Sequence, residues 1–493
     1  MQSAVMARVA FAGLGAAVLS LSFVPSSSAG LSSSSDSVTA AQPNFVVLLL
    51  DDARVDDFEP AYMPATNSLV GDQGARFDRF YSPFPLCCPA RATLLTGQYA
   101  HNHGVIDNLA PYGVYAFDDS HTLGTWLDAT YQTGFIGKYL NGYGDSGTDT
   151  SYIPPGWDEW DVPLEPALYD YMSFDVNHDG AVSRVDQYAT AWSGDQAVKF
   201  IGDAALSAEP FFLYTAFIAP HNGPPHTDSL VDIPSPFVEP KYQDTYSGPA
   251  RPADPSFNEA DVSDKNPRVA MRPRLTSQQI AQIADLMAQR REALASVDDQ
   301  IARIMEVLSA TGQLDNTYVF VTSDNGFMLG EHRFQGGKKM LYEPSSRIPL
   351  QIRGPAVPTD VRIDKMSGLM DFAPTILDLA DIPVTSTNLG LAMDGRSLVG
   401  AFDNVASPHP VVLEDHSDTT PTDPGGWLQR GLATDRWVYI RFPAQNNFEE
   451  LYDMSVDPFQ RENLAGKRAY VDQLRRLREQ WSSRYSCSGS ACR

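Results

Sequence analysis

The sequence predicts an α/β fold in which helices flank a large, mainly parallel sheet, with a smaller C-terminal α+β domain. Three observations support this fold class. Several short apolar runs end abruptly in polar residues, which is typical of strands buried on both faces of a parallel sheet. Helical stretches separate these runs, and strands that alternate with helices imply parallel pairing. A chain of 493 residues is also too long for one ordinary core, which favours a companion domain.

The apolar runs are the expected central strands of the sheet. In order along the chain they cover residues 44–50, 132–136, 211–218 and 318–322. Ligands of such sheets bind beyond the carboxyl ends of the strands. Each run is followed by side chains suited to chemistry, so we expect these residues to meet in one crevice: Asp51, Asp52, Lys138, His221, Asp324 and Asn325.

The clearest helix covers residues 276–310, where apolar residues recur roughly every 3.6 positions and Gly312 supplies a stop. Between His221 and this helix lies a long segment rich in Pro, Gly and Asp, which we expect to form a loop that walls the crevice. Near the C-terminus, short strand-like runs and a final helix predict the smaller α+β unit: 411–413, 436–441 and 469–484.

The first residues have the layout of a secretory signal peptide, because Arg8 precedes an apolar run and small residues precede Gly30. The apolar run is shorter than the ~20 residues of a spanning helix. We therefore expect a secreted or extracytoplasmic protein without a stable membrane anchor. The expected organisation is a signal peptide at 1–29, a Ser-rich disordered linker at 30–42, a catalytic domain at 43–400 and a C-terminal α+β subdomain at 401–493.

The chain is strongly acidic. Lysine and arginine number 36 against 61 aspartates and glutamates, which gives a formal net charge of −25. Nucleic acid binding needs a basic patch or stripe, so we expect no nucleic acid partner. An anionic substrate must find a local basic pocket rather than a basic face.

The four cysteines fall into two pairs. Cys487 and Cys492 flank a short polar segment near the C-terminus, which in an exported protein favours a small disulfide loop. Cys87 and Cys88 are adjacent, and a disulfide between neighbours is strained. This second pair therefore indicates chemistry rather than crosslinking.

The segment around Cys87 predicts an anion site. Pro89 suits the first turn of a helix, which places Cys87 near the helix N-terminus, where backbone N–H groups favour an anion. Arg91 stands four residues after Cys87, so the two side chains can lie on the same helical face. The segment therefore combines an anion site with an unusual nucleophile.

This segment resembles the signature of the type I sulfatase family, which begins Cys-x-Pro-x-Arg and continues toward Thr-Gly. Cys87, Pro89 and Arg91 fit the signature, and Cys88 takes its variable second position. The Cys-Cys-Pro-x-Arg variant, together with the residues at 101–103 and 137–141, is most similar to the glucosamine-6-sulfatase branch. The resemblance covers residues 43 to about 466 and includes these further motifs: 44–52, 137–139, 219–221, 322–326, 337–338 with 342–343, 370–371 with 374–375, 395–398, and 450–453 with 457–458 and 463–464.

The resemblance implies an alkaline-phosphatase-like fold and a sulfatase, which is a sulfuric ester hydrolase. In that family the first cysteine of the signature is oxidised to formylglycine during export, and its hydrate supplies the nucleophilic hydroxyl. For this chain it implies that a formylglycine-generating enzyme converts Cys87. The implied substrate is a small-molecule or oligosaccharide sulfate ester, either of a sulfated sugar such as N-acetylglucosamine-6-sulfate or of an aryl alcohol.

The resemblance also implies a divalent cation held by Asp51, Asp52, Asp324 and Asn325 together with the modified Cys87. These residues offer hard oxygen ligands, which suit calcium, or magnesium, rather than zinc. Asp324 is also expected to accept the proton of the attacking hydroxyl.

The remaining implied roles concern the sulfate and the leaving alcohol. Arg91, Lys138 and Lys338 would bind the sulfate oxygens, and His221 with Lys338 would protonate the departing alcohol. Lys338 is chosen over Lys339 because of its spacing to the Tyr-Glu pair that follows, as in the family.

Two features leave alternatives open. Many sulfatases have a histidine two residues after the first active-site lysine, where it helps to expel sulfate, but this chain has Leu140. His103 and Asn141 are the candidates for that role. Residues 175–186 match the spacing of a calcium loop, yet they also read as a hairpin that turns at 178–180.

Two other functions compete with a sulfatase. One is a phosphodiesterase or phosphonate monoester hydrolase of the alkaline phosphatase superfamily, which a comparison of aryl sulfate with phosphodiester hydrolysis would separate. The other is a catalytically inactive protein that binds sulfated glycans on the same scaffold. The intact nucleophile, ligand set and lysines argue against the second alternative.

Overall fold

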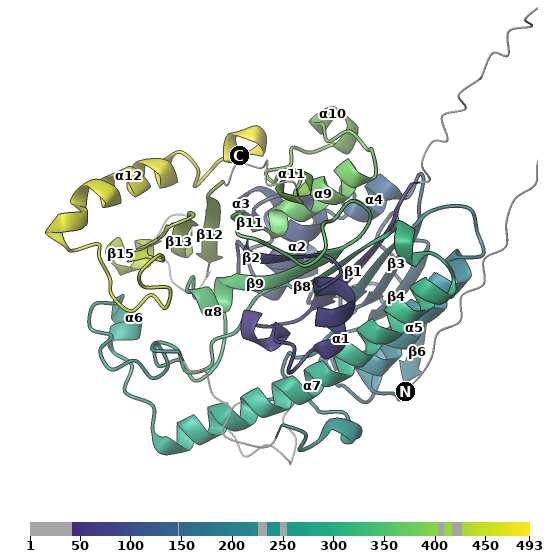
Figure 1. The fold of residues 1–493 in the computed structure, drawn as a ribbon, viewed down its shortest axis with the longest axis horizontal. Helices are drawn as coiled ribbons and strands as arrows, with labels where there is room; N and C mark the ends of the chain where they lie inside the picture. The colour runs from purple at the N-terminus through teal and green to yellow at the C-terminus, as the bar shows by residue number, and fades with distance from the viewer. Residues whose placement is uncertain (1–41, 146, 225–233, 247–253, 403–408, 417–425) are drawn as a thin grey trace, which may run out of the picture. The chain divides into compact units, whose positions relative to one another are not determined.

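The computed structural model describes residues 42–145, 147–224, 234–246, 254–402, 409–416 and 426–493. Its largest element is a mixed sheet with the strand order β10-β2-β9-β8-β1-β7-β3-β4-β5-β6, in which β11 also pairs with β2 (Figure 1). Its strands are β1 (Asn44–Leu50), β2 (Ala75–Tyr81), β3 (Gln132–Gly137), β4 (Glu159–Pro163), β5 (Phe174–His178), β6 (Ala181–Val185), β7 (Phe211–Ala216), β8 (Thr317–Ser323), β9 (Arg347–Arg353), β10 (Val361–Ile363) and β11 (Ser367–Gly368).

The centre of this sheet is parallel, as the sequence predicts. Strand β1 pairs with β7 on one side and with β8 on the other, so that Leu49 lies beside both Ala216 and Thr322. The parallel pairing continues from β7 to β3 and from β3 to β4. Every residue of β1 is buried, which explains why its sequence is a continuous apolar run.

Both edges of the sheet add antiparallel pairs. Strand β9 pairs with β8 and β2, and β4, β5 and β6 pair in succession. In the β5–β6 hairpin, Asp175 lies opposite Arg184 and forms an ion pair with it at 3.3 Å, and Asn177 lies opposite Val182. The hairpin alternative for residues 175–186 is therefore confirmed. A calcium ion at this hairpin stays a prediction: Asp175 and Asn177 lie on β5 and Ser183 on β6, whereas Asp179 and Asp186 lie outside the two strands.

Helices cover both faces of the sheet. Val47 and Leu49 of β1 pack in one core with residues of α2 and α9, whereas Val46 and Leu48 pack in a second core with α5 and α7. Figure 1 shows these two helical layers on opposite sides of the strands. The helices are α1 (Pro64–Thr66), α2 (Cys87–Thr96), α3 (Ala100–His103), α4 (Leu123–Leu127), α5 (Ala189–Ala204), α6 (Pro267–Ala270), α7 (Ser277–Ala310), α8 (Glu343–Ser346), α9 (Phe372–Leu379), α10 (Ser386–Leu389), α11 (Val399–Phe402) and α12 (Val471–Ser482).

The long predicted helix is α7. It begins after Thr276, whose hydroxyl accepts a hydrogen bond from Gln279 N, and it ends shortly before Gly312. Gly312 has a φ of 72°, a conformation that glycine adopts without strain.

A second sheet forms the C-terminal part of the fold. Its four antiparallel strands are β12 (Val411–His416), β13 (Trp427–Ala433), β14 (Trp437–Phe442) and β15 (Phe448–Asp453), and α12 packs with them. Glu414 N donates to Pro83 O at 2.8 Å, which ties β12 to the loop after β2. The predicted disulfide between Cys487 and Cys492 is confirmed. Residues 42–493 form one compact unit, and the boundary at residue 400 stays a prediction.

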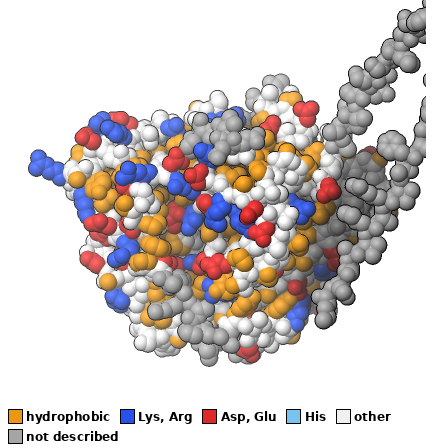
Figure 2. All heavy atoms as spheres, viewed as in Figure 1, with side chains coloured by type: hydrophobic (Ala, Val, Ile, Leu, Met, Phe, Trp, Pro, Cys, Tyr) orange, Lys and Arg blue, Asp and Glu red, His pale blue; other side chains and the backbone are white. Residues whose placement is uncertain are grey.

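Some predictions fall on residues outside the described ranges. The signal peptide and the linker lie there except for Gln42, and so do two parts of the loop after His221. None of the helices in the described part of the chain has the length and apolar composition of a membrane span. On the face shown in Figure 2, acidic and basic side chains are interspersed with apolar ones.

Candidate active site

Five of the predicted site residues lie at the carboxyl ends of parallel strands. Asp51 and Asp52 follow β1 directly, Asp324 and Asn325 follow β8, and Lys138 follows β3. These three strands belong to the parallel centre of the sheet, so their ends meet at one edge. The structure thus places these side chains where the sequence analysis expects the crevice.

The remaining predicted residues approach the same edge from other elements. Cys87 is the first residue of α2, and the next backbone N–H, that of Cys88, donates to Asn108 Oδ1 at 2.9 Å. His221 comes from the segment beyond β7, and Lys338 from the loop between β8 and α8. The structure brings all the predicted site residues together, and their roles stay predictions.

Oxygen donors gather around Asp52. Its backbone N–H donates to Asp324 Oδ1 at 3.1 Å, and its Oδ1 accepts from Asn325 Nδ2 at 2.6 Å. On the other side, Asp51 Oδ1 lies 3.6 Å from Cys87 Sγ. Carboxylates, an amide oxygen and the Cys87 thiol therefore share one buried space.

This space fits a divalent cation. Potential ligand atoms of Asp51, Asp52, Cys87 and His221 lie within 4.8 Å of one another. Within the described part of the chain, the buried oxygens Asp52 Oδ2 and Asn325 Oδ1 have no hydrogen-bond partner, although buried oxygens normally have one. Asp52 also has a φ of 70°, a strained conformation that is typical of functional sites. Oxygen donors of this kind are the ligands that calcium and magnesium prefer.

Arg91 joins two of these carboxylates. Its Nε donates to Asp324 Oδ2 at 3.0 Å, and its Nη2 lies 3.4 Å from Asp51 Oδ2. Its Nη1 donates to the Lys138 carbonyl oxygen at 2.7 Å, and Lys138 Nζ is itself paired with Asp51. Both cationic side chains are buried, so they act in a low-dielectric environment.

Lys338 completes the cationic group. Its Nζ is paired with Asp52 and lies 2.9 Å from Cys87 Sγ. Three cationic side chains thus face three carboxylates, and their formal charges cancel. A divalent cation added to this set would leave the site positive and suited to an anion.

The surroundings set the protonation of the site. Burial and the nearby Asp51 carboxylate raise the pKa of the Cys87 thiol, so the unmodified thiol stays protonated and is a weak nucleophile. Burial alone would raise the pKa of Asp51, but Lys138 and its other cationic neighbours hold that pKa well below the ordinary value. For Lys338 the directions are reversed. Burial alone would lower its pKa, but Asp52 raises that pKa above the ordinary value, so the lysine stays charged.

His221 presents its Nε2 to the cluster. Its Nδ1 lies 2.7 Å from the Asn222 carbonyl oxygen, which can only accept, so Nδ1 carries the hydrogen. Nε2 lies 3.8 Å from Asp52 Oδ2. Burial lowers the pKa of His221 to about 4 against the opposing effect of Asp51. An anionic substrate beside the ring would raise this pKa and favour a proton on Nε2.

Tyr169 is a site residue that the sequence analysis does not predict. It ends the short 3-10 helix η4 (Ala167–Tyr169), and its ring contacts both His221 and Lys138. A single tyrosine in a short turn carries neither periodicity nor a motif, so no sequence signal marks it. Asn141 donates to the Tyr169 hydroxyl at 2.7 Å and lies beside Cys88, which places this candidate next to the cluster.

The other candidate for expelling sulfate, His103, has different contacts. Its Nε2 lies 3.0 Å from Thr93 Oγ1, and its Nδ1 accepts from Val105 N at 3.1 Å. Burial lowers the pKa of His103 to about 3. His103 thus links α3 to α2 rather than facing the carboxylates.

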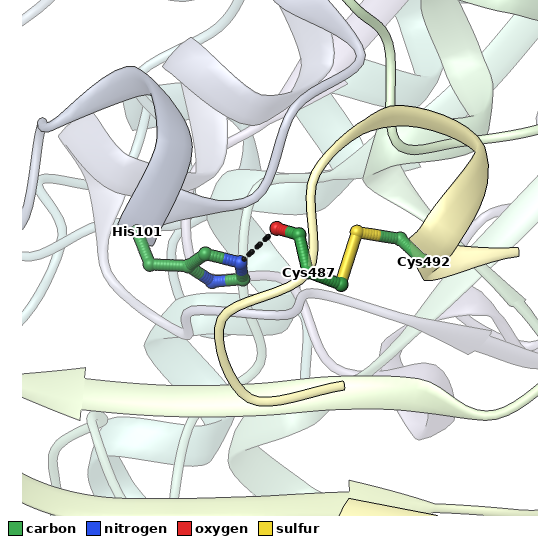
Figure 3. Close-up of side chains that lie close together, drawn as sticks. All are labelled: His101, Cys487 and Cys492. Atoms are coloured by element: carbon green, nitrogen blue, oxygen red, sulfur yellow. Dashed lines mark hydrogen bonds between the residues drawn. A yellow bond between two sulfur atoms is a disulfide. The ribbon is translucent and has the colours of Figure 1, made fainter. Parts of the chain in front are cut away.

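His101 links α3 to the C-terminal tail. Its Nδ1 lies 2.9 Å from Glu414 Oε1, and its Nε2 lies 2.9 Å from the Cys487 carbonyl oxygen (Figure 3). The sulfurs of Cys487 and Cys492 are joined in the disulfide, so they are not free to bind a metal. This neighbourhood is therefore a structural contact.

A cleft of about 1010 Å³ has a different lining from the cluster. Its arginines include Arg54 and Arg347, which are paired with Asp56 at 2.7 Å and with Glu343 at 2.8 Å. None of the predicted site residues lines it. Both of these arginines are neutralised by carboxylates, so we place the function at the cluster around residue 87.

Comparisons with known proteins agree with this fold. The chain matches the family model "Sulfatase" over residues 43–382 and the model "N-sulphoglucosamine sulphohydrolase, C-terminal" over 330–485. It is 30% identical over 501 residues to an arylsulfatase of Volvox carteri, which covers 92% of this chain and 76% of the relative. It is also 30% identical over 502 residues to the N-acetylglucosamine-6-sulfatase of Homo sapiens, which covers 92% of this chain and 86% of the relative.

A solved structure has a similar fold. The structure of BT4656 in complex with its substrate, D-glucosamine-2-N,6-O-disulfate, matches with a TM-score of 0.66 and 24% identity, over 90% of this chain and 97% of the other. The fold is therefore α/β and alkaline-phosphatase-like, as predicted. The family model spans well over half of the chain, and the chain belongs to the sulfatase family. This membership confirms the predicted enzyme class, a sulfuric ester hydrolase.

Proposed function

We propose that this enzyme hydrolyses sulfate monoesters of a sulfated sugar, such as N-acetylglucosamine-6-sulfate, or of an aryl alcohol, after Cys87 has been converted to formylglycine. The observation that carries the proposal is the buried cluster in which oxygen donors and cationic side chains surround residue 87. The unmodified thiol is a weak nucleophile there, because burial and Asp51 raise its pKa. A formylglycine hydrate would supply a hydroxyl nucleophile instead, and a formylglycine-generating enzyme is the partner expected to make it.

We assign the cation to Asp51, Asp52, Asp324 and Asn325 together with residue 87. The support is the set of hard oxygen donors and the two buried oxygens without a hydrogen-bond partner in the described residues. Calcium is the preferred ion, with magnesium as the alternative. When bound, it would add positive charge that polarises the sulfate group.

The sulfate would be held by Arg91, Lys138 and Lys338. Arg91 and Lys138 contact the Asp51 side of the cluster, whereas Lys338 lies 2.9 Å from Cys87 Sγ. Fixed cationic groups of this kind stabilise the negative charge that builds on the leaving oxygen as the S–O bond breaks. The burial of Arg91 and Lys138 strengthens the effect, because little water screens them.

Two groups would transfer protons, one from the attacking hydroxyl and the other to the departing alcohol. Asp324 would accept the proton of the attacking hydroxyl. His221 would donate a proton from Nε2 to the departing alcohol, with charged Lys338 beside it. Without that proton an alkoxide would have to leave, which is unfavourable for a sugar alcohol.

The names of similar proteins support a sugar substrate. One relative is an N-acetylglucosamine-6-sulfatase, and the similar solved structure holds D-glucosamine-2-N,6-O-disulfate. Another relative is an arylsulfatase, which supports aryl sulfates as assay substrates. We propose a secreted or extracytoplasmic location on the basis of the signal-peptide layout of residues 1–29.

The proposal is tested by producing the protein with a formylglycine-generating enzyme and measuring two quantities. Mass spectrometry of the peptide containing residue 87 should show the aldehyde. Turnover of N-acetylglucosamine-6-sulfate and 4-nitrophenyl sulfate should exceed that of bis(4-nitrophenyl) phosphate. If the aldehyde is present and the phosphodiester is the faster substrate, the enzyme is a phosphodiesterase. Glycan binding without any turnover would instead indicate the inactive glycan-binding alternative.

A further inference from the structure

Tyr169 contacts two groups to which the proposed function gives different tasks. Its ring stacks on the His221 imidazole, with ring centroids 4.4 Å apart and an interplanar angle of 19°. Lys138 Nζ lies 4.8 Å from the centroid of the same ring. One ring thus contacts the group proposed to hold the sulfate and the group proposed to protonate the alcohol.

The Tyr169 ring is connected to α2, the helix that begins at Cys87 and that we call the nucleophile helix. Its hydroxyl accepts a hydrogen bond from Asn141 Nδ2 at 2.7 Å. Asn141 is fixed in turn by Cys88, because Asn141 N donates to Cys88 Sγ at 3.0 Å and the thiol lies 3.3 Å from Asn141 Oδ1. Cys88 is the neighbour of Cys87 on α2. A chain of contacts therefore runs from the nucleophile helix to the tyrosine ring.

The contact with Lys138 is one between a cation and a neutral ring. Burial raises the pKa of the Tyr169 hydroxyl, so the phenol stays protonated at physiological pH. A cation near an aromatic ring is attracted by the ring quadrupole, and the attraction is stronger when both groups are desolvated. Lys138 is fully buried and is also paired with Asp51, so the ring and the carboxylate together fix its ammonium group.

The position of the His221 ring depends on the same tyrosine. The Asn222 carbonyl oxygen fixes the tautomer of His221, and the Tyr171 hydroxyl donates to the His221 carbonyl oxygen at 2.5 Å. These contacts hold the backbone and one ring nitrogen. The distance of 3.8 Å from Nε2 to Asp52 Oδ2 is too long for a hydrogen bond, so stacking on Tyr169 supports the face of the imidazole.

We infer that Tyr169 is a positioning residue that holds Lys138 and His221 in place beside residue 87. The inference rests on the proposed function, because it takes the tasks of these two groups from it. The aromatic ring contacts both groups and is the main working part of Tyr169, whereas the hydroxyl orients the ring through Asn141 and adds an interaction with Lys138. Loss of the ring should therefore harm catalysis, whereas loss of the hydroxyl alone should harm it little.

The test compares Tyr169→Phe with Tyr169→Leu on two substrates, N-acetylglucosamine-6-sulfate and 4-nitrophenyl sulfate. The sugar is a poor leaving group that needs a proton, and nitrophenolate is a good one that does not. Tyr169→Phe should keep kcat/KM within about 3-fold on both substrates. Tyr169→Leu should lower kcat/KM by about 100-fold on the sugar sulfate and by about 10-fold on the aryl sulfate, in line with the contribution of a positioned proton donor.

The same substitution made in a second enzyme variant distinguishes a positioning role of Tyr169 from a general structural role. In a His221→Ala enzyme, Tyr169→Leu should lower kcat/KM on the sugar sulfate by no larger a factor than on the aryl sulfate. The reason is that the proton donor positioned by Tyr169 is absent from this enzyme. Tyr485→Leu, a change at a tyrosine that is 39% exposed near the C-terminus, serves as the matched control. Melting temperatures and the aldehyde content of residue 87 are measured for every variant.

Three results would overturn the inference. The first is that Tyr169→Leu keeps kcat/KM on both substrates. The second is that it lowers both equally, with a lower melting temperature, which would show a structural role. The third is a wild-type enzyme that carries the aldehyde and hydrolyses no sulfate ester. That result overturns the proposed function as well, whereas the first two leave the proposed function intact.

Discussion

Lys338 Nζ lies 2.9 Å from Cys87 Sγ and is paired with Asp52 at the same time. One ammonium group thus contacts both the proposed nucleophile position and a carboxylate that we assign to the cation. The next residue, Lys339, points elsewhere, because its Nζ lies 3.2 Å from Asp107 Oδ2. Two adjacent lysines therefore offer a matched pair for mutation.

Lys338→Met should lower kcat/KM for sulfate esters by about 100-fold to 1,000-fold, because it removes a fixed cation from the place where negative charge builds. Lys339→Met should stay within about 5-fold of the wild type, because its partner Asp107 is not part of the cluster. Steady-state kinetics on 4-nitrophenyl sulfate measures both. Equal losses in the two variants would contradict the assignment of Lys338.

Calcium should raise the melting temperature of the protein, because a ligand that binds only the folded state stabilises it. At a calcium concentration of roughly 100 times Kd, the shift should be about 3 °C for a chain of this size. Asp52→Asn should abolish this shift, and the chelator EDTA should reverse it in the wild type.

Asp175→Asn is the control for the calcium experiment. Asp175 lies on the β5–β6 hairpin, where its carboxylate pairs with Arg184. This variant should keep the full calcium shift. A shift that disappears in Asp175→Asn and persists in Asp52→Asn would move the cation to the hairpin and contradict the site.

The Cys487–Cys492 disulfide should contribute to stability rather than to catalysis. The crosslink closes a short loop, and Gly489 within that loop donates to Asp394 Oδ1 at 2.6 Å. Replacing both cysteines by serine should lower the free energy of unfolding by about 2 kcal/mol, as loop-closure entropy predicts for a loop of this length. Thermal melting measures the loss. Turnover at 25 °C that falls together with stability would show that the tail also shapes the active site.

The contact of His101 with Glu414 should make stability depend on pH. Burial alone would lower the pKa of His101, but the Glu414 carboxylate raises it above the ordinary value of 6.5. Protonation is thus more favourable in the folded state, so the stabilising effect is fully present below pH 6.5 and is lost as pH rises through the raised pKa. His101→Gln should destabilise the protein more at pH 6 than at pH 9. Melting curves that show the opposite order would contradict the ion pair.

The sequence predicts the centre of the fold because strands that are buried on both faces have a continuous apolar sequence. Strand β1 is apolar throughout and stops at Asp51, so both the strand and the position of the carboxylate can be read directly. Strand β9 has no such pattern, because its sequence contains Pro349 and Gln351 between apolar residues. Its antiparallel place between β8 and β2 depends on long-range pairing.

The candidate site also contains residues that the sequence predicts and residues that it does not predict. Asp52, Lys138 and Asp324 are predictable because each follows a strand at the end where ligands bind. Tyr169 is not, because its contact with His221 is made across the fold by a residue in a short turn. The family signature predicts Cys87 as the nucleophile, whereas the contacts that surround Cys87 become visible only in the structure.

The central claim is that residue 87, and not its neighbour, carries the nucleophile. Cys87 Sγ faces Asp51 and Lys338, whereas Cys88 Sγ faces Asn141. The most direct test is turnover of 4-nitrophenyl sulfate by Cys87→Ala and Cys88→Ala, each produced with a formylglycine-generating enzyme. We predict no detectable turnover for Cys87→Ala and at least about a fifth of the wild-type rate for Cys88→Ala, since Cys88 acts only through Asn141. An active Cys87→Ala enzyme beside an inactive Cys88→Ala enzyme would contradict the account.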